Sequence, residues 1–126
     1  MIEVGEGKYK VWLISLKMGD DLLVIIGGGE KPHLGGFSLC IDGPPISISL
    51  PNHKDYLISH EAAEKIHRKI NHNIIVICGI HIDKATDYDI KILIENSKEC
   101  INKFLINPSS ACIDCASLLK DLKSSQ

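Results

Sequence analysis

The sequence predicts an α/β protein with a mostly antiparallel sheet sandwiched by helices, in the element order β-β-β-β-α-β-α-α. Two observations lead to this prediction. Four runs of strand-forming residues follow one another with turn-forming connections, which is typical of an antiparallel meander. Two later stretches carry apolar residues at helical spacing, and a fifth apolar run precedes the second of them. All 126 residues are expected to form a single domain, 1–126, with its core at about 9–105.

The strand predictions rest on apolar patterning between turn residues. Strands are expected at 9–17, 22–26, 37–41, 46–50 and 74–78. The run 22–26 is apolar at every position, which is typical of a strand covered on both faces. The run 46–50 alternates apolar and serine residues, so one of its faces should be buried. Residues 1–8 are predicted to be a loose lead-in.

Three helices are expected, and each has its own boundary signals. The first begins near Ser59, a favourable N-cap residue, and ends at 71–73. The second begins at Thr86, where Asp89 three positions later gives a capping-box pattern. A short amphipathic helix at about 109–123 closes the chain. It carries the Cys-x-x-Cys pair Cys112 and Cys115, interpreted as small core or interface residues because no second pair lies at zinc-site spacing.

Composition limits the classes of function. The formal net charge is −2 with both signs interspersed, which gives no indication of a nucleic-acid partner or an anionic membrane surface. Aromatic residues make up only 5%, too few for base-stacking platforms. No run approaches the roughly 18 apolar residues of a membrane span. Five cysteines, an odd number, and the lack of a signal-peptide pattern predict a cytoplasmic protein with reduced thiols.

A glycine-rich segment, residues 27–36, separates two of the predicted strands. Its sequence is Gly-Gly-Gly-Glu-Lys-Pro-His-Leu-Gly-Gly. Backbone amides of Gly28 and Gly29 are expected to form a nest for a phosphate or carboxylate, with His33 and Lys54 as further donors. The segment matches neither the Walker A pattern nor Gly-x-Gly-x-x-Gly. A wide structural turn without a ligand is the alternative interpretation.

Three histidines follow predicted strands: His33, His53 and His81. Ligand sites favour such strand-end loops. In an extended segment His81 and Asp83 point the same way, as a polar pair facing a cleft would. If the three histidines converge, they would suit zinc or iron with or without Asp83 or Asp55, although hydrogen-bonded pocket residues are the alternative. The remaining histidines, His60, His67 and His72, are predicted to lie on a solvated helix face.

Three segments together resemble a known family: residues 27–36, residues 50–55 (Leu-Pro-Asn-His-Lys-Asp) and residues 78–85 (Cys-Gly-Ile-His-Ile-Asp-Lys-Ala). Their order resembles that of the small D-subunit proteins encoded with gallate-type decarboxylases, the prenylated-flavin chaperone-like family. The resemblance covers about 9–105 and leaves out the C-terminal Cys-x-x-Cys. It implies a fold like that of proteasome assembly chaperones, an α/β sandwich that dimerises.

The resemblance also implies a function. The chain would be a non-catalytic accessory protein that binds prenylated FMN, or FMN, and delivers it to a UbiD-type decarboxylase, acting as a homodimer. The residues then expected to contact the cofactor are Gly28, Gly29, His33, Gly35, His53, Lys54, Asp55, His81 and Asp83. Trp12, Tyr56 and Tyr88 are the rings available for stacking. Two alternatives stay open: an assembly chaperone without a small-molecule ligand, and a metal-dependent enzyme using the histidine triplet His33, His53 and His81.

Overall fold

A computed structural model describes residues 1–51 and 53–113 of the chain. The strands are β1 (Ile2–Val4), β2 (Val11–Met18), β3 (Asp21–Gly29), β4 (Gly36–Cys40), β5 (Ile46–Ser49), β6 (Ile74–His81) and β7 (Cys112–Ile113). The α-helices are α1 (Tyr56–Ile70) and α2 (Asp87–Ile106), and two short 3-10 helices span Gly7–Tyr9 and Pro108–Ala111. No helix in this described part is long and apolar enough to cross a membrane.

The strands form one sheet in the order β1-β2-β3-β6-β4-β5, and β7 pairs with β2 in parallel. β2 and β3 form one antiparallel hairpin, and β4 and β5 form another. β6 lies between the two hairpins, parallel to β3 and antiparallel to β4. The predicted mostly antiparallel sheet is therefore confirmed. The predicted four-strand meander is wrong, because β6 lies between β3 and β4 in the sheet and separates them.

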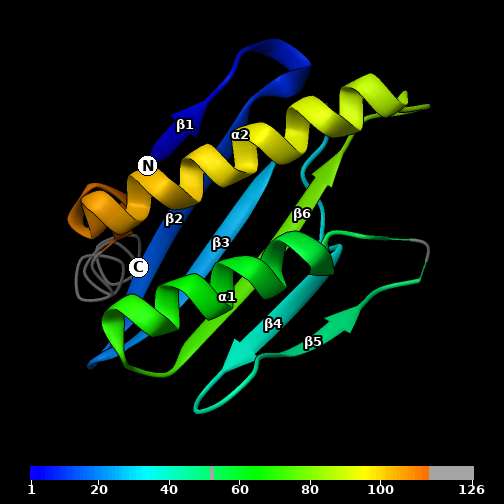
Figure 1. Ribbon diagram of the computed structural model, residues 1–126. Coiled ribbons are helices and arrows are strands. Elements are labelled where there is room, and N and C mark those ends of the chain that lie inside the picture. Colours follow the sequence, from blue (N-terminus) through cyan, green and yellow to red (C-terminus); the bar gives the residue numbers. More distant parts are fainter. Residues whose placement is uncertain (52, 114–126) are drawn as a thin grey trace, which may run out of the picture.

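Both helices pack on the same face of the sheet (Figure 1). The residues pointing toward them include Val24 and Ile26 of β3 and Val76 and Cys78 of β6, all almost fully buried. Ile66 of α1 and Phe104 of α2 complete this core. The α/β class is thus confirmed, with the described helices forming one layer on one side of the sheet.

Several predicted boundaries differ from the observed ones. Residues 1–8 are not loose, since β1 pairs with β2 and covers one end of its edge. The first α-helix begins at Tyr56, and Asp55 rather than Ser59 occupies the N-cap position. Of the helix predicted at 109–123, residues 109–111 belong to a 3-10 helix and 112–113 to β7. Residues 114–123, including Cys115, lie outside the described residues.

The capping box predicted at the start of α2 is confirmed. The Asp89 amide donates to the Thr86 hydroxyl, and the Asp89 carboxylate accepts from the Thr86 amide. Tyr9 donates to the same carboxylate at 2.6 Å, and the Lys8 ammonium lies 3.6 Å away. These donors, the Tyr9 hydroxyl foremost, lower the pKa of Asp89 from its ordinary 3.8 to about 2.

A chain of hydroxyl groups connects α1 to the β4–β5 hairpin. Ser38 lies 2.7 Å from Ser59 and 2.6 Å from Ser47, measured between the hydroxyl oxygens. Ser47 continues the chain to Nδ1 of His60 at 2.7 Å. His60 is thus partly buried and hydrogen-bonded, which differs from the solvated position predicted for it. Ser38 and Ser59 are fully buried, so this network satisfies polar groups inside the core.

The sheet face away from the helices is apolar across five strands. Register places Ile14, Ile25, Ile77 and Phe37 side by side on it, from β2 through β3 and β6 to β4. We call this surface the open face; its members are Trp12, Ile14, Leu16, Leu23, Ile25, Phe37, Leu39, Ile46, Ile48, Ile75 and Ile77. Ile46 and Ile48 of β5 are exposed, so the face predicted to be buried is uncovered in the single chain.

Candidate functional site

The topology explains why the three strand-end histidines meet. β3 is parallel to β6, and β5 is antiparallel to β4, which is itself antiparallel to β6. β3, β5 and β6 therefore end on the same side of the sheet, where β3 leads to His33, β5 leads to His53, and His81 is the last residue of β6. The ring centroids of His33 and His53 are 4.5 Å apart, and those of His33 and His81 are 5.5 Å apart.

The segment between β3 and β4 must pass over β6, because β6 separates the two strands in the sheet. We call residues 30–35 the crossing loop. Its backbone is fastened to β6 by hydrogen bonds from Glu30 to His81 (2.8 Å), from His33 to Gly79 (3.4 Å) and from Gly35 to Cys78 (3.0 Å). A Cβ atom at position 79 would overlap the carbonyl group of His33. The glycine at 79 is therefore required for this close approach.

The glycines at 27–29 belong to β3 and are not part of a loop. The Gly29 amide donates to Lys10, and the Glu30 and Lys31 amides both donate to His81. These amides are occupied, so the segment does not present the row of free donors that an anion nest requires. A Cβ at position 27 would overlap the ring of Trp12. These glycines thus shape the strand end, and a cofactor contact at Gly28 or Gly29 stays a prediction.

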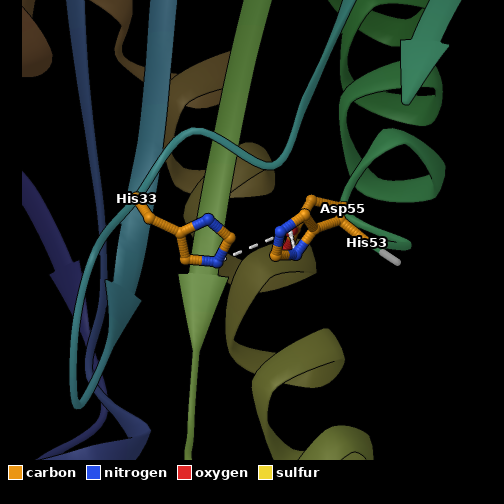
Figure 2. Close-up of side chains that lie close together, drawn as sticks. All are labelled: His33, His53 and Asp55. Carbon is orange, nitrogen blue, oxygen red and sulfur yellow. Dashed lines mark ion pairs between the residues drawn. The ribbon is translucent and has the colours of Figure 1, made fainter. Parts of the chain in front are cut away.

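Asp55 lies beside His33 and His53 (Figure 2). One carboxylate oxygen, Oδ1, accepts from the amide of Ile80 at 3.4 Å. The other, Oδ2, lies 4.0 Å from Nε2 of His33 and 4.0 Å from Nδ1 of His53. A side chain at Gly35 would overlap this carboxylate. Burial raises the pKa of Asp55, and the Ile80 amide and the two imidazoles oppose that rise.

His33 and His81 differ in exposure. Nε2 of His33 is buried and has no hydrogen-bond partner among the described residues. His81 lies farther out, with 42% of its side chain exposed, and its Nε2 is 2.8 Å from the carboxylate of Asp83. The pairing of His81 with Asp83 agrees with the predicted orientation of these two side chains. His33 and Asp55 therefore form the inner part of the cluster, and His81 with Asp83 forms its solvent side.

A pocket of about 370 Å³ adjoins the cluster between the N-terminal ends of α1 and α2. Its walls are mainly apolar and include Ile58, Ile80, Ile82 and Leu93, whereas His53, Lys54, Asp55 and His81 supply its polar lining. A larger cavity of about 560 Å³ lies at the other end of the sheet. Cys112, one residue before the end of the described chain, lines this larger cavity. His33, His53 and His81 are not among its lining residues.

Sequence reasoning identified the polar side of this site and missed its apolar side. Ile58, Ile80 and Leu93 fit helix and strand patterns, so nothing marked them as pocket residues. Gly79 carried a signal that was available: a glycine inside an apolar strand indicates close backbone approach. None of the proposed stacking rings, Trp12, Tyr56 and Tyr88, is among the described residues that line this pocket.

The fold places the chain in a class of small α/β proteins in which the described helices pack on one face of a mixed sheet. The structure is similar to a chain in the crystal structure of a chaperone complex for yeast 20S proteasome assembly, with a TM-score of 0.57. The similarity covers 87% of this chain and 94% of that chain at 15% identity, so it concerns the fold alone. It confirms the fold that the resemblance implied.

The family follows from the sequence comparison. A family model described as the prenylated flavin chaperone LpdD-like domain matches residues 5–108, so the chain belongs to this family. The chain is also 31% identical over 84 residues to Protein LpdD of Lactiplantibacillus plantarum. That match spans 62% of this chain and 62% of LpdD, less than two thirds of the relative's length.

Proposed function

We propose that the protein binds prenylated FMN in the pocket beside the histidine cluster and delivers it to a UbiD-type decarboxylase in the cytoplasm. Family membership supports a role connected with prenylated flavin. The observation that carries the proposal is the pocket itself: about 370 Å³, with apolar walls and polar groups concentrated on one side. That combination is typical of cofactor sites.

The lining suits the two ends of a prenylated flavin mononucleotide. The tricyclic ring and its prenyl addition are largely apolar, and they would bury surface against Ile58, Ile82 and Leu93. The phosphate is anionic, and Lys54 is an exposed cation on the rim of the same pocket. His53 and His81 supply further hydrogen-bonding atoms for ribityl or ring oxygens. The protein would thus hold the cofactor by shape and charge without performing chemistry on it.

A homodimer formed through the open face is part of the proposal. Ile14, Ile25 and Ile77 lie at its centre, and no described helix covers them. A contiguous apolar sheet surface of this kind is typical of an interface. Gly27 and Gly79 are paired in register, and a side chain at 27 would point toward Trp12 on the open face. The crossing loop, which lies over Gly79, therefore lies beside this surface, and dimerisation would bring another chain close to the site.

The binding half of the proposal is tested by co-expression with a flavin prenyltransferase. The purified wild-type protein should be yellow, and Lys54→Ala should retain much less flavin. Lys69→Ala, which removes an exposed cation at the far end of α1, is the matched control and should stay yellow. A colourless wild-type protein, or equal flavin in all three proteins, would count against a site at Lys54.

The delivery half needs a separate measurement. Flavin-loaded protein is mixed with an apo-decarboxylase of the UbiD type, and the two are separated again. The proposal expects flavin to move to the decarboxylase faster than free flavin is taken up at the same concentration. If the decarboxylase takes up protein-bound flavin and free flavin at equal rates, the protein binds flavin but does not deliver it.

An assembly chaperone without a small-molecule ligand is the second candidate function, and the open face favours it. In that case the apolar sheet surface would bind a partner protein, and the pocket would stay empty. The two candidates differ in the effect of mutations. Lys54→Ala would leave such a protein unaffected, whereas Ile25→Lys in the open face would abolish its activity.

A further inference from the structure

We infer that His33, His53 and Asp55 form a binding site for one divalent transition-metal ion of the zinc class. Each residue offers one ligand atom, and all three atoms lie within 4.8 Å of one another. This set differs from the histidine triplet, because Asp55 replaces His81. The inference concerns the metal alone and does not depend on flavin binding.

The distances are close to those of a loaded site. Ligand atoms about 2.1 Å from a tetrahedral ion are roughly 3.4 Å apart. Oδ2 of Asp55 lies 4.0 Å from a ring nitrogen of each histidine. Each of these two distances would have to shorten by roughly 0.6 Å to match a tetrahedral site. The rings have room for it, since 23% of the His33 side chain and 33% of the His53 side chain are exposed.

The unpartnered nitrogen of His33 is an independent observation that points to a ligand. Nε2 is buried, faces Oδ2 of Asp55 and has no hydrogen-bond partner in the described chain. A buried polar atom without a partner costs about 1–3 kcal/mol, and such atoms in native proteins call for a water or an ion. A bound cation would satisfy this nitrogen.

The orientation of the carboxylate also fits a ligand role. Oδ1 of Asp55 is held by the Ile80 amide, which leaves Oδ2 directed at the two imidazoles. A second partner of this kind, fixing a ligand from behind, is usual at metal sites. Gly35 provides the space in which the carboxylate lies. The backbone around the cluster is therefore arranged before any ion binds.

The donor set selects the class of metal. Two imidazole nitrogens and one carboxylate oxygen suit Zn²⁺, Co²⁺ or Ni²⁺, whereas Mg²⁺ and Ca²⁺ prefer oxygen ligands. Three protein ligands leave at least one coordination position open for water or an anionic oxygen. His53 and Asp55 also line the 370 Å³ pocket, so this position is next to the pocket. His81 is outside the proposed ligand set because its Nε2 is already paired with Asp83.

The test uses the full-length protein after removal of metal by a chelator. Zn²⁺ is titrated by calorimetry, and Co²⁺ by its visible absorption, with no flavin present. The wild-type protein should bind about one ion per chain, and the ion should raise its thermal midpoint. His33→Ala and Asp55→Ala should each weaken binding at least tenfold, the scale of loss seen even for residues that only support metal ligands.

Three control variants separate this site from others. His81→Ala and His72→Ala should keep wild-type affinity, since neither residue is in the proposed ligand set. The double variant Cys112→Ser/Cys115→Ser should also bind normally, and the cobalt spectrum of the wild type should lack a thiolate charge-transfer band. His33→Gln provides a second His33 variant that preserves polarity if the alanine variant fails to fold.

The inference is overturned by any of three results. These are no saturable binding to wild type, binding that is lost only in the cysteine double variant, or equal affinity in wild type and a folded His33 variant. Equal loss in His81→Ala and His33→Ala would also overturn it, because it would favour the histidine triplet as the ligand set.

Discussion

The carbonyl group of His33 occupies the space that a side chain at position 79 would need. Because Gly79 has no Cβ, the crossing loop can lie directly on β6 and donate from the His33 amide to the Gly79 carbonyl. This contact carries His33 across the end of β6 toward Asp55 and His53. A glycine in a strand far along the sequence thus positions a side chain of the candidate site.

Gly79→Ala should therefore displace the crossing loop. The expected cost is about 1–3 kcal/mol in the free energy of unfolding, typical of an overpacked site, together with loss of flavin binding. Chemical denaturation and flavin titration measure the two effects. Gly19→Ala is the matched control. Gly19 has a positive φ, but a Cβ added there would meet no described atom within 4 Å. This variant should lose about 1 kcal/mol in the free energy of unfolding and keep its flavin binding. Normal binding in Gly79→Ala would contradict this account of the loop.

Replacing the central isoleucine of the open face should prevent self-association. Ile25→Lys places a charge between Ile14 and Ile77, where a second copy would bury it without a partner. Light scattering after size-exclusion chromatography should give a dimer for wild type and a monomer for this variant at micromolar concentration. Ile106→Lys, at a side chain that is 82% exposed on α2, should remain dimeric. A monomeric wild type would refute the dimer.

Stability should fall at low pH in a way that depends on Asp89. Its pKa is about 2 in the folded protein against an ordinary 3.8, so its stabilisation is complete above about pH 4 and is lost as pH falls toward 2. Asp89→Asn should lower the thermal midpoint at neutral pH and show a smaller further decrease between pH 4 and 2. Asp87→Asn, an exposed residue in the same helical turn, serves as the control. Parallel stability–pH curves for Asp89→Asn and wild type would contradict the assignment.

Ser38 should contribute more to stability than its size suggests. Ser38→Ala removes the central hydroxyl of a chain that also contains Ser47 and Ser59, and it leaves the buried Ser59 hydroxyl with fewer partners. The expected loss is about 1–3 kcal/mol in the free energy of unfolding, measured by urea denaturation. Ser109→Ala, at an exposed position, should change it by about 0.5 kcal/mol or less. Equal losses of stability in Ser38→Ala and Ser109→Ala would show that the chain of hydroxyl groups has no special role.

Local patterns predicted most of the elements in the described chain. The apolar run at 22–26 and the capping box at Thr86 and Asp89 were sufficient to locate β3 and the start of α2. Pairing between distant segments was not predictable in this way. Nothing near residues 74–81 in the sequence indicates that they pair with β3 rather than follow a meander. β3 and β5 would run parallel in a meander too, so the new element is the direction of β6. Because β6 runs parallel to both, His81 at its end lies near His33 and His53.

The role of the glycines was the least predictable part of the site. A glycine cluster is compatible with an anion-binding loop or with a strand that is crossed closely by other groups. The backbone amides of Gly29, Glu30 and Lys31 all donate hydrogen bonds within the protein. These three amides are therefore not free to bind an anion. The acceptors of these bonds are the carbonyls of Lys10 and His81, and both residues are distant from this segment in the sequence.

The most direct test of the proposed function is an equilibrium titration of the full-length protein with prenylated FMN. Binding is read from flavin absorbance that co-elutes with the protein, using both oxidised and reduced cofactor. The proposal predicts saturable binding to wild type with at least one of these forms. Lys54→Ala should bind that form roughly tenfold or more weakly, as expected for a lost charged hydrogen bond, and Lys69→Ala should bind it normally. No saturable binding with either form, or equal affinity in wild type and Lys54→Ala, would contradict the proposed site.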